Sequence, residues 1–470
     1  MVYIAIDGCA PAAKMVQQRQ RRFLAAASTH TSGTHTQTFN SNCISPGTDF
    51  MSRMCEYIKH SILKHISKTR IRFVFSSANV PGEGEHKIMQ YVRDHKDIHN
   101  LRNCIYGPDG DLIMLVLASP SSNFSILRDD LDAPNTFVVI DMKLVRSQLF
   151  RELRVCRTTD VSCIRLIHDF ITMGFLVGND FLPKIQMFYY LEDGMTAMID
   201  TYIREFSAKN RYITHDGEII LSELKRFVRC ISMREEEMIA SQVARNFDKY
   251  TERKFIDSVI VRSVTDQRLD FKRYAKLYND RLCENVCGDV STVDKITNEY
   301  VRGLYWTFMY YTDRCPSYEW YYPYYRAPLM IDLADVTFVE SRFVKGKPHE
   351  PYQQLLGILP AKSRKLIPKE LRHLMTDEDS PISHMYPSSF EIDYEGKYKE
   401  HQGIPLLPPI HYFSLRRVYE DAVSDDVRGQ KNNKESRCFS YRYSETAEPR
   451  KIRTIFGTID CAKFTIEIAT

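Results

Sequence analysis

Six acidic residues occur beside glycines or at the ends of predicted strands and helices. They are Asp7, Glu83, Glu85, Asp109, Asp111 and Asp180. In the E-x-E and D-x-D pairs, an extended backbone directs both carboxylates to the same side. Gly84 and Gly110 separate the members of these pairs and allow another stretch of backbone to approach closely. The pattern therefore predicts a cluster of carboxylates.

Such a cluster favours hard cations. Carboxylates without neighbouring His or Cys ligands suit Mg²⁺ or Mn²⁺. Two such ions, about 4 Å apart, can hold the attacking and the leaving oxygen of a phosphoryl displacement. Any one of these acids could instead cap a helix or be solvated in a loop. Six of them in this pattern favour the metal site, whereas we expect His86 to be structural.

A cationic face is predicted on the helix that follows Asp7. Its residues, spaced 4, 7 and 8 positions from the first, are Lys14, Gln18, Arg21 and Arg22. This spacing places them on one side of a helix. Three cations and an amide suit a terminal phosphate, because Arg makes bidentate contacts. The alternative is an ordinary solvated basic face. Arg19 points elsewhere, and we expect it to serve general attraction of the backbone or to lie at the surface.

The segment 300–328 is rich in aromatic residues and contains both tryptophans of the sequence, Trp306 and Trp320. Aromatic faces can stack single-stranded bases, with roughly 1–3 kcal/mol for each base. For most of these rings a packed core is the simpler interpretation. We expect one or two of them to reach a nucleic acid.

Strands and helices must hold these groups together. Alternation of the two predicts an α/β fold with an open, mostly parallel sheet. Ligands of such sheets bind at the carboxyl ends of the strands, where the acids lie. The predicted strands are residues 2–6, 72–76, 103–106, 123–127 and 136–140, and the predicted helices are residues 14–27, 49–67, 85–95 and 161–177.

Four regions are predicted from the changes in composition along the 470 residues. They are an α/β nuclease core (1–189), a helical connecting region (190–299), an aromatic-rich region (300–410) and a polar tail (411–470). The 12 cysteines contain no CxxC pair, which indicates reduced thiols and a cytoplasmic protein. No apolar run approaches the roughly 18 residues of a membrane span, so we expect no membrane partner.

Several long motifs resemble those of the Xrn family of 5′→3′ exoribonucleases. Their residues are more similar to the cytoplasmic branch of the family than to the nuclear branch. Four of them belong to the predicted nuclease core: IAIDGCAPAAKMVQQRQRRF (4–23), SNCISPGT (41–48), ANVPGEGEHK (78–87) and GNDFLP (178–183). Two more resemble the second conserved region of the family: CPSYEWYYPYYRAP (315–328) and HLMTDEDSP (373–381).

This resemblance implies hydrolysis of single-stranded RNA from a 5′-monophosphate end to mononucleotides, in RNA decay. It implies that the six acids bind two divalent cations, Mg²⁺ or Mn²⁺, and carry out catalysis. Lys14, Gln18, Arg21 and Arg22 match the pocket that binds the 5′ phosphate. Tyr318 and Trp320 lie in the motif that supplies a base-stacking residue.

The chain also departs from the family pattern. We expect it to lack an N-terminal segment of the family that carries a strand, a metal-binding Asp and a stacking His, and to lack the C-terminal accessory domains. Ala12 and Ser77 stand where the family has a basic residue and an Asp. Two alternatives therefore stay open: an RNA-binding or decay-scaffold protein with impaired catalysis, and a nuclease that acts on DNA.

Overall fold

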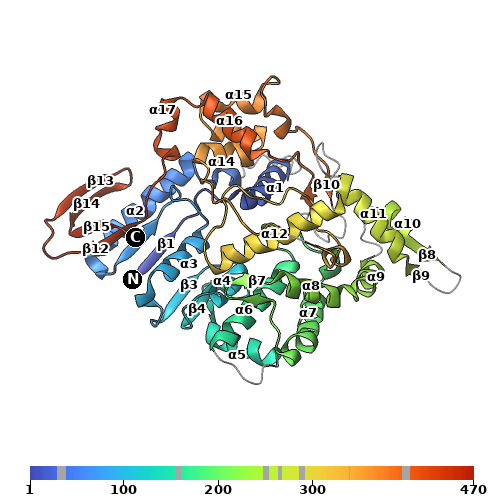
Figure 1. The fold of residues 1–470 in the computed structure, drawn as a ribbon. Helices are drawn as coiled ribbons and strands as arrows, with labels where there is room; N and C mark the ends of the chain where they lie inside the picture. The colour runs from blue at the N-terminus through green and yellow to red at the C-terminus, as the bar shows by residue number, and fades with distance from the viewer. Residues whose placement is uncertain are drawn as a thin grey trace.

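The computed structural model shows a mixed α/β fold in which the two ends of the chain lie near each other (Figure 1). Strands and helices alternate at the N-terminus, and a mainly helical region follows. The structure describes residues 1–28, 39–154, 160–246, 253–262, 267–284, 292–337, 339–393 and 403–469.

One mixed sheet has the strand order β1–β2–β12–β15. β1 (Val2–Ala5) is parallel to β2 (Phe73–Ser76). β12 (Phe439–Tyr443) is antiparallel both to β2 and to β15 (Phe464–Ile468). The last strands of the chain thus extend the sheet that the first strand begins.

A second sheet has the order β3–β4–β5. β3 (Asn103–Tyr106) is parallel to β4 (Phe124–Asp129), and β5 (Phe137–Asp141) is antiparallel to β4. The predicted α/β class is confirmed, but the strands form two mixed sheets instead of one open sheet. Residues 411–470, predicted as a polar tail, supply β12 and β15, because Tyr441 and Phe464 bury their rings against α2.

Two helices, α2 and α3, pack against the sheet that contains β1. α3 (Gly84–Asp94) contacts β1, whereas α1 (Ala12–Ser28) packs against α14 (Pro351–Ile358). α2 (Asp49–Thr69) begins at Thr48, whose hydroxyl accepts a hydrogen bond from the Met51 amide, and ends at Arg70, with φ of 53°.

α12 (Val293–Thr312) crosses the middle of the molecule and contacts α4, α6, α11 and α13 (Figure 1). Trp306 and Phe308 are buried on this helix. The other helices are α4 (Asp111–Leu117), α5 (Met142–Glu152), α6 (Asp160–Leu176), α7 (Leu191–Glu205), α8 (Leu221–Ser232), α9 (Glu235–Asn246), α10 (Arg253–Val259), α11 (Phe271–Glu284), α13 (Met330–Leu333), α14 (Pro351–Ile358), α15 (His373–Thr376), α16 (Tyr412–Ala422) and α17 (Asp425–Arg428).

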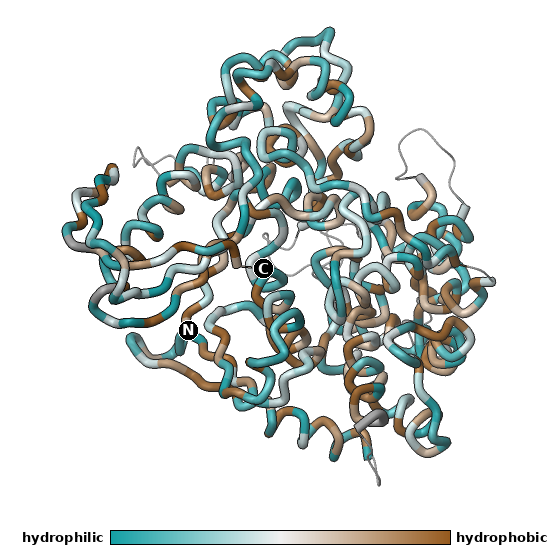
Figure 2. The backbone as a smooth tube through the Cα atoms, turned by 60° about the vertical axis from the view of Figure 1, so that its left-hand side comes forward, coloured by the Kyte–Doolittle hydropathy of each residue, from teal (hydrophilic) through white to brown (hydrophobic). Residues whose placement is uncertain are grey.

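Four further pairs of short antiparallel strands occur among the described residues. They are β6 (Thr214–His215) with β7 (Glu218–Ile219), β8 (Ile260–Arg262) with β9 (Gln267–Leu269), β10 (Ile392–Asp393) with β11 (Ile404–Pro405), and β13 (Arg450–Thr454) with β14 (Gly457–Ala462). Hydrophobic and hydrophilic residues alternate along many of the helices, as expected for elements that bury one face (Figure 2). Within the described ranges, no helix combines the length and apolarity that a membrane span requires.

Candidate active site

Asp7 and the E-x-E pair meet because β1 and β2 run parallel. Asp7 follows β1, and its Oδ1 accepts a hydrogen bond of 2.6 Å from the Gly84 amide at the start of α3. A Cβ atom at residue 84 would lie 3.2 Å from that same oxygen. Glycine therefore lets the first turn of α3 approach Asp7, and Glu83 and Glu85 flank the contact.

Lys14 on α1 joins this group to the last predicted acid. Its Nζ lies 2.5 Å from Glu83 Oε2 and 2.5 Å from Asp180 Oδ2. The Glu83 side chain is only 4% exposed and that of Asp180 is 21% exposed. Gln17 also donates a hydrogen bond to Asp180, through its Nε2. The sequence predicts Lys14 as a phosphate ligand, whereas in this structure its ammonium group is shared between two carboxylates.

Two tyrosines of α12 hold the acids from the opposite side. The Tyr310 hydroxyl donates to Glu83 Oε1 at 3.0 Å, and the Tyr311 hydroxyl donates to Asp111 Oδ2 at 2.9 Å. Neither tyrosine was predicted in the site from the sequence. The sequence feature that could have indicated them is their place on a core helix, because a buried tyrosine hydroxyl needs a hydrogen-bond partner.

The negative charge of the acids exceeds the positive charge of the groups beside them. Burial raises the pKa of Glu83, although Lys14 opposes the change. Burial, together with the charges of Glu83 and Asp7, raises the pKa of Glu85 to about 8. Burial likewise raises the pKa of Asp111. A group of oxygen donors in this condition fits a divalent cation, which would relieve the repulsion.

The acids do not form a complete set of ligands around a single ion. Among the described residues, no three His, Cys, Asp or Glu side chains converge as a metal-binding group. Asp109 is exposed, and its Oδ1 accepts the Asp111 amide at 3.1 Å. Electrostatic effects of the acids on one another, partly through Lys14, link Asp7, Glu83, Glu85, Asp111 and Asp180 into one connected set, and Asp109 lies beside Asp111 at its exposed edge.

The cationic face of α1 continues away from Lys14. Arg21 is exposed, and its guanidinium lies 3.9 Å from Asp180 Oδ1. Arg22 donates to the Ile44 carbonyl at 2.6 Å and to Ser45 Oγ at 3.1 Å. Gln18 Oε1 is buried without a hydrogen-bond partner, which leaves an acceptor on this face.

Arg19 corrects one expectation of the sequence analysis. It is 3% exposed and not at the surface. Its guanidinium donates to the Gly357 and Met385 carbonyls and lies over the Phe23 ring. These carbonyls give the buried cation its hydrogen bonds, so Arg19 ties α1 to the C-terminal helices.

The two candidate stacking residues have different surroundings. Trp320 packs on Trp306, with ring centroids 5.6 Å apart, and its Nε1 donates to Glu299 at 3.3 Å. Trp320 is 9% exposed and so belongs to the core. Tyr318 instead lines a cavity of about 300 Å³.

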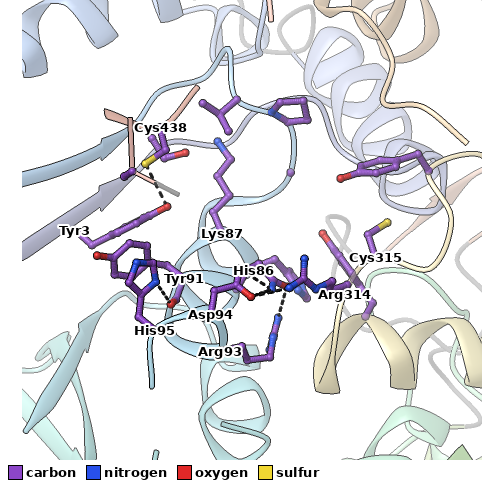
Figure 3. Close-up of a pocket in the computed structure, with 18 of the residues that line it drawn as sticks. Tyr3, His86, Lys87, Tyr91, Arg93, Asp94, His95, Arg314, Cys315 and Cys438 are labelled. Atoms are coloured by element: carbon purple, nitrogen blue, oxygen red, sulfur yellow. Dashed lines mark hydrogen bonds and ion pairs between the residues drawn. The ribbon is translucent and has the colours of Figure 1, made fainter. Parts of the chain in front are cut away.

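This cavity is lined by residues of α3, among them His86, Lys87 and Tyr91 (Figure 3). The His86 ring stacks on Tyr310 at 3.6 Å between centroids and separates the cavity from Glu83. Buried in this stack, His86 has the structural surroundings that the sequence predicts. Arg93 and Arg314 line the lower side of the cavity, and Arg314 pairs with Asp94 at 2.6 Å.

Comparison with known proteins identifies the class of protein to which this site belongs. The family model described as the XRN 5′-3′ exonuclease N-terminus matches residues 1–130. The model described as the Xrn1 helical domain matches residues 160–268 and 266–440. The chain belongs to the Xrn family of 5′-3′ exoribonucleases, which confirms the resemblance seen in the sequence.

Similar curated proteins carry the corresponding names. The chain is 31% identical to "5'-3' exoribonuclease 1" of Homo sapiens, over 95% of this chain and 31% of the human protein. It is 28% identical to "5'-3' exoribonuclease 1" of Schizosaccharomyces pombe, over 91% and 43% of the two chains. It is 27% identical to "5'-3' exoribonuclease 2 homolog" of Drosophila melanogaster, over 97% and 64%. The chain thus spans between about a third and two thirds of these relatives.

Proposed function

We propose that this chain is a metal-dependent 5′→3′ exoribonuclease that hydrolyses 5′-monophosphate RNA to mononucleotides in RNA decay. The observation that carries the proposal is the connected set Asp7, Glu83, Glu85, Asp111 and Asp180, with the α1 cations beside it. The names of the similar proteins support the same reaction.

In this proposal the five connected acids and Asp109 hold two divalent cations, Mg²⁺ or Mn²⁺. When bound, such ions activate water and stabilise the leaving oxygen. Tyr310 and Tyr311 fix Glu83 and Asp111 through their hydroxyls, so that these carboxylates keep one orientation. Positioning of this kind supplies much of the rate enhancement in phosphoryl transfer.

The 5′ phosphate binds on the α1 face in this proposal. Arg21 and Arg22 supply guanidinium groups, and Gln18 and Lys14 lie about one and two turns nearer to the acids. Lys14 would exchange part of its ion pairing with Glu83 and Asp180 for the phosphate. Tyr318 offers a ring to the terminal base from the neighbouring cavity.

One observation favours a second candidate, an RNA-binding protein with impaired catalysis. Lys14 occupies the position between Glu83 and Asp180 with a positive charge of its own. If that charge permanently replaces a cation, RNA would bind to the α1 face without being cleaved. The two functions predict different products from the same RNA.

The test uses a single-stranded RNA labelled at its 3′ end, with either a 5′ monophosphate or a 5′ hydroxyl, in Mg²⁺. The proposal predicts that the 3′ label is converted to a mononucleotide, with strong preference for the RNA that carries the monophosphate. Glu192→Gln, at an exposed acid on α7, serves as the control variant and should leave the rate unchanged. Tight binding of the monophosphate RNA without any product would support the binding protein instead.

A further inference from the structure

A second cavity, of about 400 Å³, lies between α2, the paired strands β2 and β12, and residues 429–437. We call it the α2 cavity. None of the six acids lines it. Its floor is aromatic: Phe75 pairs with Phe439 across the two strands, and Tyr441 lies two residues further along β12. Because side chains alternate along a strand, these three rings point to the same face. Phe439, which is only partly buried, is the ring most open to the cavity.

The rim of the α2 cavity is cationic. Four cations line it, from α2 and from residues 429–437: Lys59, Lys431, Lys434 and Arg437. Two carboxylates, Glu56 and Glu435, line it as well, which leaves a net charge of +2. Lys431 is neutralised by Glu56 at 2.5 Å.

Three of these cations are available to a ligand. Lys59, Lys434 and Arg437 are exposed. None of the three has an ion-pair partner among the residues that the structure describes. Unpaired cations that surround an apolar floor attract an anion with a flat, apolar part.

The rim of the cavity is held by hydrogen bonds that do not involve the side chains of those three cations. Asn79, which follows β2, donates to the Lys431 carbonyl at 3.2 Å and to the Lys434 carbonyl at 2.7 Å. The Ser436 amide donates to the Asn79 carbonyl at 2.9 Å. Asn432 donates to Asp49 at the start of α2 at 2.7 Å. The rim is therefore fixed to two elements, and a ligand need not order it.

We infer that the α2 cavity binds one nucleoside 5′-monophosphate unit. Arg437 and Lys434 would bind the phosphate, because a guanidinium group contacts phosphate oxygens in pairs and an ammonium group adds charge. The base would lie against Phe439. This unit has two sources, a free mononucleotide or one nucleotide of an RNA strand. The inference does not depend on the chain's being an active nuclease.

The test is isothermal titration of the full chain with AMP, with adenosine as the ligand that lacks the phosphate. Lys434→Glu/Arg437→Glu should weaken AMP binding at this site at least tenfold, and adenosine should bind at least tenfold more weakly than AMP. The matched control is Lys362→Glu/Lys365→Glu, which reverses two exposed cations of another surface segment and should change nothing. Arg21→Ala, on the proposed 5′-phosphate face, should leave this binding event in place.

AMP binding that Arg21→Ala removes and Lys434→Glu/Arg437→Glu leaves intact would overturn the inference while leaving the proposed function standing. Equal binding of adenosine and AMP would also overturn it. A 5′-hydroxyl oligonucleotide identifies the source. If it displaces AMP and shows the same dependence on residues 434 and 437, the bound unit comes from an RNA strand. If it does not compete, the site takes the free mononucleotide.

Discussion

Glu85→Gln should stabilise the protein at alkaline pH, because the Glu85 charge is disfavoured in the folded state. Its pKa rises from 4.5 to about 8 through burial and the charges of Glu83 and Asp7. A shift of one unit corresponds to about 1.4 kcal/mol, and partial access of solvent to this side chain reduces the total. We expect the variant to be about 2–3 kcal/mol more stable than the wild type at pH 9.

The sign of the pH dependence follows from the raised pKa. The folded state binds the Glu85 proton more tightly than the unfolded state does. The proton therefore stabilises the fold at pH 4.5 and below, and this stability is lost as the pH rises through about 8. Glu85→Gln removes that loss, so the two proteins should differ little at pH 4.5 and progressively more up to pH 9.

Urea denaturation at pH 4.5, 6.5 and 9 measures this difference, with and without Mg²⁺. The matched control is Glu420→Gln, at an exposed acid on α16, which should show no such pH dependence. Mg²⁺ should stabilise the wild type more than Glu85→Gln, because the cation relieves the same repulsion. A variant that is less stable than the wild type at pH 9 would refute the reasoning.

Three further substitutions test the packing of the site. Lys14→Met leaves the buried Glu83 carboxylate without its cation and should cost about 3 kcal/mol in urea denaturation. The cost should fall as the pH is lowered, because burial raises the pKa of Glu83 and protonation removes the unpaired charge; a cost that does not change with pH would contradict the ion pairing. Tyr310→Phe removes the hydrogen bond to Glu83 and should cost about 2 kcal/mol by the same assay, and a neutral effect would show that Glu83 does not need it. Gly8→Ala places a Cβ atom 1.9 Å from the Val80 carbonyl oxygen and should lower the melting temperature, whereas Gly110→Ala meets no atom within 4 Å and should not.

The sequence predicted the part of the site that local pattern determines. Asp7 and Glu83 follow two short apolar strands, and parallel pairing of those strands brings the acids together. The glycine between Glu83 and Glu85 was predicted for close approach, and the structure shows that it faces Asp7. These features depend on a few residues at strand ends and need no knowledge of distant parts of the chain.

The remaining features depend on contacts between residues far apart in the sequence. Tyr310 and Glu83 are separated by 227 positions, and no local pattern specifies that distance. β12 pairs with β2, and aromatic residues of both strands are buried in one hydrophobic core, although the composition of residues 411–470 is polar. From the sequence alone, Trp320 and Arg19 could belong to a surface or to a ligand site. Only the packing around them shows that they are buried.

Asp111→Asn provides the most direct test of the proposed function, because the substitution keeps the size of the side chain and the hydrogen bond from Tyr311 can persist. The measurement is the rate of mononucleotide release from a 5′-monophosphate RNA in Mg²⁺ by the wild type and by this variant, at matched RNA binding. We expect release by the wild type and a loss of at least a hundredfold in the variant. Equal rates for the two proteins would contradict a catalytic role for these carboxylates.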